Sequence, residues 1–490
     1  AECEHVRGNV KITLPKNSTQ SKLIKFRRYK LNYEEFIKSK GIKTQTSGFD
    51  IDKNELNPLL FEHQKDIVKW ALKKGKAAIW SGTGTGKTNM ELEFGKQVHE
   101  KTNGNILIVA PLAVTHQTVK EGLKFGYDVN ICRTQEDVKK GLNITNYEMI
   151  EHFEPDKFIA IILDESSILK SFTGKYRTLL TEMFKETHYK LSCTATPSPN
   201  DYMELGTQAE FIGVMKRNEM LATFFVHDGG ETSKWRLKGH AEDKFWEWIA
   251  TWAVVFQKPS DLDYSDEGFE LPELRIHEIV VPSPKDPYCL IPKIAQTLQE
   301  RRQARKDSLE KRVAKVAEIA NARNEQFVVW CDLNAESEAL KKSIDGAVEV
   351  KGSDKTEHKV DTSNNFISGD VRVIVSKPSI YGFGLNWQHC NKMIFTGLSD
   401  SYEQYYQAIR RIWRFGQKKD VDVYIVTSEA EGAVKANVER KEKDSEKLIS
   451  EMVKHTQKIL TEEIRGTSRE TIEYYATEIM KLPEWLREAV

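Results

Sequence analysis

The octapeptide SGTGTGKT has the composition of a phosphate-binding loop: three glycines, followed at its end by a lysine and a threonine. Glycine has no side chain, so a loop rich in it can turn its backbone N–H groups toward phosphate oxygens. Lys87 is then placed to reach the β- and γ-phosphates of a nucleotide, and the Thr88 hydroxyl to bind Mg²⁺. The strict motif begins with glycine, where this chain has serine. The predicted nucleotide-binding residues of this loop are Ser81, Gly82, Thr83, Gly84, Thr85, Gly86, Lys87 and Thr88.

Two adjacent carboxylates, Asp164 and Glu165, follow the apolar run FIAIIL. At the end of a strand the first can hold Mg²⁺, and the second can polarise a water molecule that attacks a phosphate. An Asp-Glu pair in this position is often only a polar turn, so the pair alone leaves both interpretations open. The phosphate-binding loop earlier in the chain favours the first, with Thr88 and Asp164 as the Mg²⁺ ligands.

A glutamine, Gln64, stands just before the first apolar run, in the sequence LLFEHQ. Its amide carries both a donor and an acceptor, so it can bind the edge of adenine by a pair of hydrogen bonds. The neighbouring His63 is expected to pack or to be solvated rather than to bind a ligand.

The stretch QAIRRIWRFGQ concentrates three arginines in five positions, beside two aromatic residues. Arg411 and Arg414 are three apart, so on a helix they share one face, while the third arginine points elsewhere. Trp413 and Phe415 are expected to anchor this helix in its own part of the fold. A solvated helix face would tolerate the arginines but would not account for the aromatic residues.

Two series of short apolar runs, separated by helical stretches, must position these residues. Strands that are apolar throughout and alternate with helices predict a parallel sheet covered on both faces. Two such series predict an α/β chain with two lobes and a cleft between them. The runs are 77–80, 105–111, 129–133, 143–147, 158–165 and 189–195 in the first series, and 326–331, 347–352, 371–377, 392–397 and 421–428 in the second.

The remaining segments differ in composition from the two series of apolar runs. The run KFWEWIATWAVVF reads as one buried helix, the stretch around ERRQARKDSLEKR as a long charged helix, and the last sixty residues as charged helix. The expected organisation is an N-terminal extension at 1–55, a first lobe at 56–280 with an aromatic helical insertion at about 215–270, a helical linker at 281–325, a second lobe at 326–430 and a helical segment at 431–490.

Composition bounds the class of protein. With 490 residues the chain is longer than a usual single domain, so two or more hydrophobic cores are expected. Lys+Arg and Asp+Glu both number 73, so a polyanion would have to bind in a local basic groove. The six cysteines form no C-x-x-C pair, which favours reduced core thiols over disulfides or zinc. No apolar run approaches a membrane span, and the first residues lack the apolar stretch of a secretory signal. We therefore expect a cytoplasmic or nuclear protein with no membrane partner.

Seven stretches, taken together, resemble the motifs of superfamily 2 helicases, and in finer detail the Swi/Snf-type DNA-dependent ATPases. The resemblance covers roughly residues 56–430, and the compact build is similar to members from bacteriophages and prophages. In chain order the stretches are SGTGTGKT, LIVAPLAVTHQ, NITNYEMI, LDESSILKS, LSCTATPSPN, GFGLNW and QAIRRIWRFGQ.

The resemblance implies two tandem RecA-like lobes that bind ATP and Mg²⁺ between them. Arg411 and Arg414 would then be arginine fingers that stabilise charge at the γ-phosphate, with Gln407 beside them. Gly384 and Asn386 would complete the nucleotide side. Opening and closing of the cleft would move two DNA-gripping surfaces relative to each other.

The resemblance also implies DNA as the partner, held by its backbone without sequence specificity. Two further features leave alternatives open. The basic helix at 300–312 is either a DNA-facing rim or a solvated linker, and the tryptophans Trp246, Trp248 and Trp252 either stack on bases or pack in a core. The loops expected to face DNA are 110–117, 145–148, 194–197, 348–355 and 376–387.

One departure from the family is Ser167, where the acidic motif normally ends in histidine. The histidine couples the nucleotide site to the next motif, so this coupling is expected to be altered. The expected function is a DNA-dependent ATPase that translocates along or remodels duplex DNA, acting as a monomer in the cytoplasm of a bacterial or phage-infected cell. The alternatives are a strand-separating helicase on branched DNA or RNA, and an ATP-gated DNA clamp with little turnover.

Overall fold

The computed structural model describes residues 5–6, 11–12, 46–170, 174–198, 201–227, 235–283, 298–381, 385–399 and 401–464. The chain forms two compact units, one of Ala1–Thr44 with Arg469–Val490 and one of Gln45–Ser468. In the smaller unit, β1 (His5–Val6) pairs antiparallel with β2 (Lys11–Ile12). The two sheets and the described candidate site residues lie in the larger unit.

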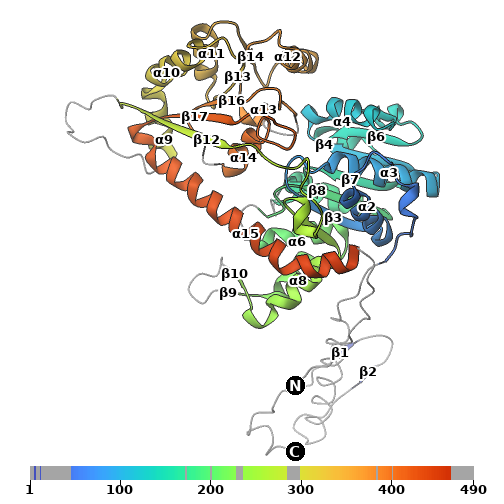
Figure 1. Cartoon of the computed structure of the whole chain (residues 1–490). Coiled ribbons are helices and arrows are strands. Elements are labelled where there is room, and N and C mark those ends of the chain that lie inside the picture. The colour runs from blue at the N-terminus through green and yellow to red at the C-terminus, as the bar shows by residue number, and fades with distance from the viewer. Residues whose placement is uncertain are drawn as a thin grey trace, which may run out of the picture. The chain divides into compact units, whose positions relative to one another are not determined.

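The first lobe is built on a seven-stranded sheet in which every strand pair is parallel (Figure 1). Its strands are apolar along their length, as burial on both faces requires. In spatial order they are β11 (Ala253–Phe256), β3 (Lys76–Ser81), β8 (Tyr189–Thr194), β7 (Phe158–Asp164), β4 (Asn105–Ala110), β6 (Leu142–Asn146) and β5 (Val129–Ile131).

Seven α-helices of the described residues belong to this lobe, with a short antiparallel hairpin of β9 (Phe225–His227) and β10 (Trp235–Leu237). A 3₁₀ segment, η5 (Ser166–Lys170), follows the acidic pair directly. The helices are α2 (Glu62–Lys74), α3 (Lys87–Thr102), α4 (Leu112–Lys124), α5 (Lys175–Met183), α6 (Leu205–Ile212), α7 (Arg217–Phe224) and α8 (Glu242–Ala250).

The second lobe is built on a six-stranded sheet whose strand pairs are also all parallel. In spatial order its strands are β12 (Leu274–Val281), β17 (Val421–Ser428), β16 (Lys392–Thr396), β13 (Phe327–Trp330), β15 (Val373–Ser376) and β14 (Ala347–Val350). Its helices are α9 (Leu298–Asp307), α10 (Leu309–Asn321), α11 (Asn334–Ser343), α12 (Thr356–Ser368), α13 (Pro378–Tyr381) and α14 (Tyr402–Ile409). The two parallel-sheet lobes confirm the expected tandem RecA-like fold.

The aromatic run at 244–256 is not one helix, as the sequence suggested. It forms α8, a turn, and then β11, which lies beside β3 at the edge of the first sheet. The helical reading failed because Ala-Val-Val-Phe continues the apolar pattern of α8 without a glycine or proline to mark the break. Trp246, Trp248 and Trp252 are buried, which favours packing over base stacking.

Strand β12 differs from the expected boundary at residue 280, because it pairs with β17 in the second sheet. Its polar and half-exposed alternation gives a weaker strand signal than the buried strands do. At the N-terminal side, the extension expected to end at residue 55 is also shorter. Phe49 and Ile51 pack on the core of the first lobe, and the Phe49 N–H donates to the Leu72 carbonyl.

A single helix, α15 (Gly432–Ile464), connects the cores of the two lobes (Figure 1). Val434 and Val438 near its start belong to the core of the second lobe, and Leu460 near its end belongs to that of the first. Glu463 accepts a hydrogen bond from the Trp70 indole and forms an ion pair with Lys74 at 3.0 Å. The helical C-terminal segment expected from the sequence is therefore a bridge between lobes.

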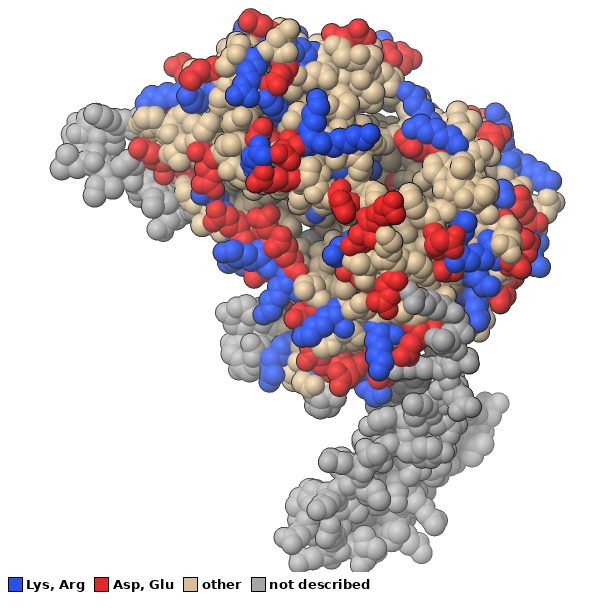
Figure 2. Space-filling model, in the orientation of Figure 1, with Lys and Arg blue, Asp and Glu red and all other residues tan. Residues whose placement is uncertain are grey.

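The surface charges are mixed, as the equal numbers of basic and acidic residues predict, and the described cysteines are free thiols. Figure 2 shows basic and acidic side chains interspersed over both lobes on the visible face. Cys132, Cys193, Cys331 and Cys390 are free and buried, while Cys3 and Cys289 lie outside the described residues. No helix in the described part of the chain is long and apolar enough to cross a membrane.

Candidate active site

The phosphate-binding loop leads from β3 into α3, as the motif requires. Gly84 and Gly86 have φ angles of +90° and +88°, a region that side chains with a Cβ rarely adopt. The Ser81 and Thr85 hydroxyls lie 2.7 Å apart, and the Thr85 hydroxyl donates to the Gly82 carbonyl. Serine at the first motif position thus helps to hold the loop, which explains why glycine is not needed there.

Lys87 folds back onto the loop that precedes it. Its ammonium donates to the carbonyls of Ser81 and Gly82, at 2.9 and 3.1 Å. Thr88, the next residue, is half-buried and its hydroxyl makes no hydrogen bond within the described residues. Both side chains stand at the N-terminus of α3, where a negatively charged ligand is favoured.

Gln64 lies against the same loop rather than in open solvent. Its amide nitrogen donates to the Thr85 carbonyl at 2.8 Å, and its amide oxygen accepts from the Phe61 N–H. A Cβ on Gly86 would stand 2.1 Å from the Gln64 amide nitrogen, so glycine at 86 makes room for this contact. Recognition of adenine by Gln64 stays a prediction, because both ends of its amide bind backbone here.

The acidic pair lies at the end of β7. Asp164 is buried, and this burial together with the neighbouring Glu165 carboxylate raises its pKa to about 7, against the opposing charge of Lys87. Glu165 has a φ of +55°, and its Oε2 is buried without a hydrogen-bond partner. A buried carboxylate beside a second one with a buried, unpaired oxygen fits a divalent cation.

Two residues of this site were missed in the sequence. The Tyr147 hydroxyl donates to the Asp164 carbonyl at 2.7 Å, which fixes the end of β7. Glu91, one turn after Lys87 on α3, is completely buried, and burial and the Asp164 charge raise its pKa well above the usual range. The spacing of Glu91 from Lys87 on a helix is the signal that identifies it in retrospect.

The arginine-rich stretch is not a continuous helix, which corrects the expectation from the spacing. Helix α14 ends at Ile409, and residues 410–416 form successive turns. Arg411 and Arg414 nevertheless converge, since both donate to the Leu385 carbonyl, at 2.8 and 3.4 Å. Arg410 does point elsewhere, with its guanidinium 4.3 Å from the centre of the Trp413 ring.

Arg411 and Arg414 carry charge in a buried setting. Burial lowers the pKa of Arg411 to about 9 and that of Arg414 to about 10, and the carboxylates of the first lobe act in the opposite direction. Gln407 is wholly buried, and its amide oxygen accepts from Arg411. The catalytic candidates of the second lobe are therefore close enough to Asp164 and Glu165 to feel their charge.

Several polar atoms around this site are buried and have no hydrogen-bond partner in the described structure. Such atoms are rare in folded proteins and mark a place where a ligand can bind. They fit a nucleotide with its Mg²⁺, since donors and acceptors come from both lobes. These atoms are Thr83 Oγ1, Glu165 Oε2, Gln407 Nε2 and Arg414 Nε.

Phe415 lies across the cleft rather than anchoring its own lobe. A Cβ on Gly84 would stand 3.1 Å from the Phe415 backbone nitrogen and 3.2 Å from its ring. The same ring packs edge-on against Phe269, at 5.4 Å between ring centres. Trp413, by contrast, follows the expectation, because it packs on the second core and donates to the Pro272 carbonyl.

Further polar contacts join the lobes at α4 and η5. Asn386, expected on the nucleotide side, donates its backbone N–H to the Gln117 side chain at 3.0 Å. Lys170, in the segment ILKS, forms an ion pair with Glu403 of α14. Gly384 lies outside the described residues. The lobes are thus in contact at several points around the cleft.

A cleft of about 900 Å³ opens between the lobes, large enough for a substantial ligand. The expected DNA-side loops at 110–117 and 145–148 contribute to its lining, as do the lysines of α4 and α12. Thr194 and Thr196 do not fit that expectation, because both are buried and the Thr194 hydroxyl accepts from the Thr196 N–H. Their hydroxyls therefore do not reach the surface here.

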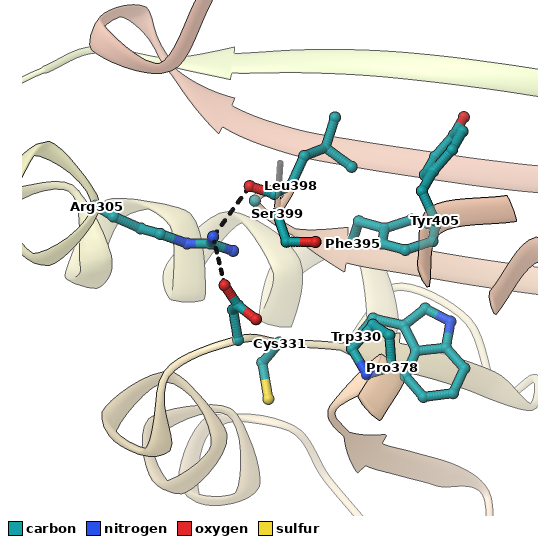
Figure 3. Close-up of a pocket in the computed structure, with 10 residues that line it drawn as sticks. Arg305, Trp330, Cys331, Pro378, Phe395, Leu398, Ser399 and Tyr405 are labelled. Atoms are coloured by element: carbon teal, nitrogen blue, oxygen red, sulfur yellow. Dashed lines mark hydrogen bonds and ion pairs between the residues drawn. The ribbon is translucent and has the colours of Figure 1, made fainter. Parts of the chain in front are cut away.

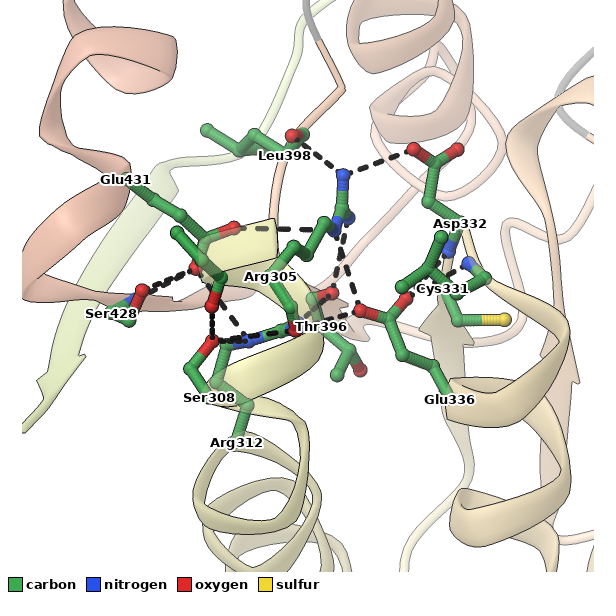
Figure 4. A network of polar contacts seen from close by, with 12 residues as sticks. Arg305, Ser308, Arg312, Cys331, Asp332, Glu336, Thr396, Leu398, Ser428 and Glu431 are labelled. Carbon is green, nitrogen blue, oxygen red and sulfur yellow. Dashed lines mark hydrogen bonds and ion pairs between the residues drawn. The ribbon is translucent and has the colours of Figure 1, made fainter. Parts of the chain in front are cut away.

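The basic helix at 300–312 consists of α9 and α10, which break at Ser308. Figure 4 shows Arg305 and Arg312 directed inward, in a network with Glu336 and Glu431. Arg312 is 2.7 Å from Glu336 and wholly buried. These two arginines hold the linker to the second lobe, so they cannot form a DNA-facing rim.

The same network borders a small cavity. As Figure 3 shows, Arg305 binds the Leu398 carbonyl on one side, and Trp330 and Phe395 lie on the other. Arg305 also donates to Asp332, at 2.9 Å. Its volume of about 10 Å³ has room for about one water molecule. It is therefore not a second ligand site.

Two protein families match separate parts of the chain. The type III restriction enzyme, res subunit, matches residues 57–199, and the helicase conserved C-terminal domain matches residues 310–416. Each match covers one of the two lobes, with the phosphate-binding loop in the first and the arginines in the second. The two matches agree with the resemblance of the sequence motifs to those of superfamily 2 helicases, among which the finer resemblance is to the Swi/Snf type.

Two individual proteins are similar to the chain. The putative protein p41 of Acyrthosiphon pisum secondary endosymbiont phage 1 is 28% identical over 175 residues, which is 31% of this chain and 38% of that protein. The chain thus matches less than half the length of that relative. The SWI2/SNF2 ATPase core of Sulfolobus solfataricus in complex with dsDNA is 16% identical, with a TM-score of 0.40 over 85% of this chain and 98% of that chain.

Proposed function

We propose that the chain is a DNA-dependent ATPase of the Swi/Snf type that couples ATP hydrolysis to translocation along, or remodelling of, duplex DNA. The observation that best supports this proposal is that the residues of the site come from both lobes. Asp164 and Glu165 come from the first lobe, and Arg411 and Arg414 from the second, while Phe415 packs on Gly84. A site completed only by two lobes links hydrolysis to their relative position.

Each residue has a distinct task in this proposal. The loop N–H groups and Lys87 bind the phosphates, and Thr88 and Asp164 hold Mg²⁺, which neutralises phosphate charge. Glu165 orients the attacking water and accepts its proton. Arg411, Arg414 and Gln407 stabilise the charge that develops on the γ-phosphate, for which the two arginines must leave the carbonyls that they bind here.

The DNA side of the proposal rests on the motifs and on the cleft. Lys120, Lys124 and Lys359 line the cleft and offer charge to phosphates without reading bases. Strand separation is less well supported, since the aromatic segment that could act as a wedge is buried around Phe245 and Trp248. We further propose that the protein works as a monomer in the cytoplasm of a bacterial or phage-infected cell, consistent with the phage relative.

The test is steady-state ATP hydrolysis without nucleic acid and with duplex DNA, single-stranded DNA or RNA. Wild type, Lys87→Ala and Arg414→Ala are compared, because Arg414 makes fewer structural bonds than Arg411. Stimulation by duplex DNA that both variants lose supports the proposal. Stimulation by single strands or RNA alone supports the helicase, and ATP-dependent DNA binding without multiple turnover supports the clamp.

A further inference from the structure

A glutamine outside every motif, Gln208, lies in the first lobe beneath the acidic turn. It stands on α6 and is completely buried. Its amide nitrogen donates to the Ser166 carbonyl at 2.8 Å, and its amide oxygen accepts from the Ser192 hydroxyl at 3.2 Å. One side chain therefore connects the turn after β7 with the interior of β8.

The turn that Gln208 holds has an unfavourable backbone. Glu165 adopts a φ of +55°, in the left-handed region that a residue with a Cβ rarely adopts because its side chain crowds the backbone. Such conformations persist only where the surroundings fix them. The Gln208 bond to the next carbonyl, that of Ser166, is one such restraint on the turn that carries the Glu165 side chain.

The other end of Gln208 reaches the strand that carries the next motif. Ser192 lies two residues before Thr194, in the middle of β8. The Ser167 hydroxyl, where the family has its coupling histidine, makes no hydrogen bond within the described residues. Beside the backbone pairing of β7 with β8, Gln208 therefore adds a side-chain connection between the acidic turn and β8.

We propose that Gln208 is a positioning residue for ATP hydrolysis, which keeps Glu165 oriented toward the attacking water and connects the acidic turn to β8. The proposal rests on the ATP hydrolysis proposed above, but not on its dependence on DNA. Because Gln208 hydrogen-bonds to Ser166 and Ser192, neither of which is predicted to bind nucleotide or metal, it acts on the rate of the chemical step rather than on binding.

The first test is Gln208→Met, which keeps the length of the side chain and removes both hydrogen bonds. We expect kcat without nucleic acid to fall about ten-fold or more, with an unchanged KM for ATP, because small displacements of a catalytic group have effects of this size. The matched control is Gln97→Met, another buried glutamine of the first lobe, which binds Glu55 and Glu93 instead. The control should keep its kcat.

A milder variant, Ser192→Ala, removes only the hydrogen bond from the Ser192 hydroxyl to the Gln208 amide oxygen. It provides a second test in case Gln208→Met does not fold. It should lower kcat several-fold at constant KM, and Gln208→Met should add little to it in the double variant. An unchanged kcat in folded Gln208→Met or in Ser192→Ala, or a rise in KM alone, overturns the proposal. If DNA did not stimulate hydrolysis by the wild type, the proposed function would be overturned instead, so the two failures are distinguishable.

Discussion

Phe415 of the second lobe lies against Gly84 of the phosphate-binding loop in the first, so closely that a Cβ on Gly84 would come within 3.1 Å of the Phe415 backbone. The residue next to Arg414 therefore touches the loop that binds phosphate. If the arginines act on the γ-phosphate, as proposed above, their access would depend on this close approach, which the small size of Gly84 permits.

Gly84→Ala should lower kcat for ATP strongly while ADP still binds, because the added methyl group obstructs approach of the second lobe. Gly126→Ala is the matched control, since Gly126 has a similar φ of +77° but no neighbour within 4 Å of an added Cβ. Both variants should lose about 1–2 kcal/mol of stability from the backbone alone. Equal hydrolysis in the two variants would show that the approach of Phe415 is not required.

The ion pair between Lys170 and Glu403 should contribute to the closed arrangement of the lobes. Lys170→Ala and Glu403→Ala should each reduce DNA-stimulated hydrolysis, and the double variant should be less impaired than the product of the two, with a coupling of about 0.5–3 kcal/mol. Lys175→Ala is the control, because Lys175 pairs with Glu151 within the first lobe, at an exposed site. Strict additivity of the first two changes would contradict a shared role.

Arg312→Met should destabilise the second lobe by about 3–5 kcal/mol, because it leaves Glu336 and Glu431 buried beside a single remaining arginine. Urea unfolding measures the change. Lys315→Met, on the exposed face of the same helix, should have little effect. If Arg312→Met instead weakened DNA binding without loss of stability, the rim interpretation would return.

His63 makes stability depend on pH. Burial lowers its pKa from 6.5 to about 4, so the folded protein keeps it neutral while the unfolded chain binds a proton below pH 6.5. Its contribution is complete above pH 6.5 and falls as the pH drops from 6.5 to about 4, by about 3 kcal/mol at most. His63→Phe should flatten this part of the stability profile, measured by urea unfolding at several pH values.

Much of the fold could be predicted because its strands are buried on both faces. All eleven apolar runs form strands, and the phosphate-binding loop and acidic pair lie where the motifs place them. The sequence pattern does not identify a strand that is buried on one face only, or one that continues the apolar run of a preceding helix. Strand β12 is half-exposed at a sheet edge, and β11 continues the apolar pattern of α8, so neither was recognised as a strand of its sheet.

The site was predictable in its residues but less so in their contacts. Spacing identified Arg411 and Arg414, yet α14 ends before them and turns bring both to Leu385. Gln208 and Glu91 carry no motif, and their importance depends on which carbonyl or carboxylate lies beside them after folding. Periodicity also could not distinguish an inward from an outward Arg312, because the partner Glu336 comes from a different helix.

Helix α15 has a consequence for how the lobes can move. A 33-residue helix extends for about 50 Å and resists changes in length, since stretching it breaks a ladder of hydrogen bonds. With Val438 embedded in one core and Leu460 in the other, α15 fixes the distance between the two points at which it is anchored. The lobes can pivot about its ends, but they cannot separate freely along its axis unless one end detaches.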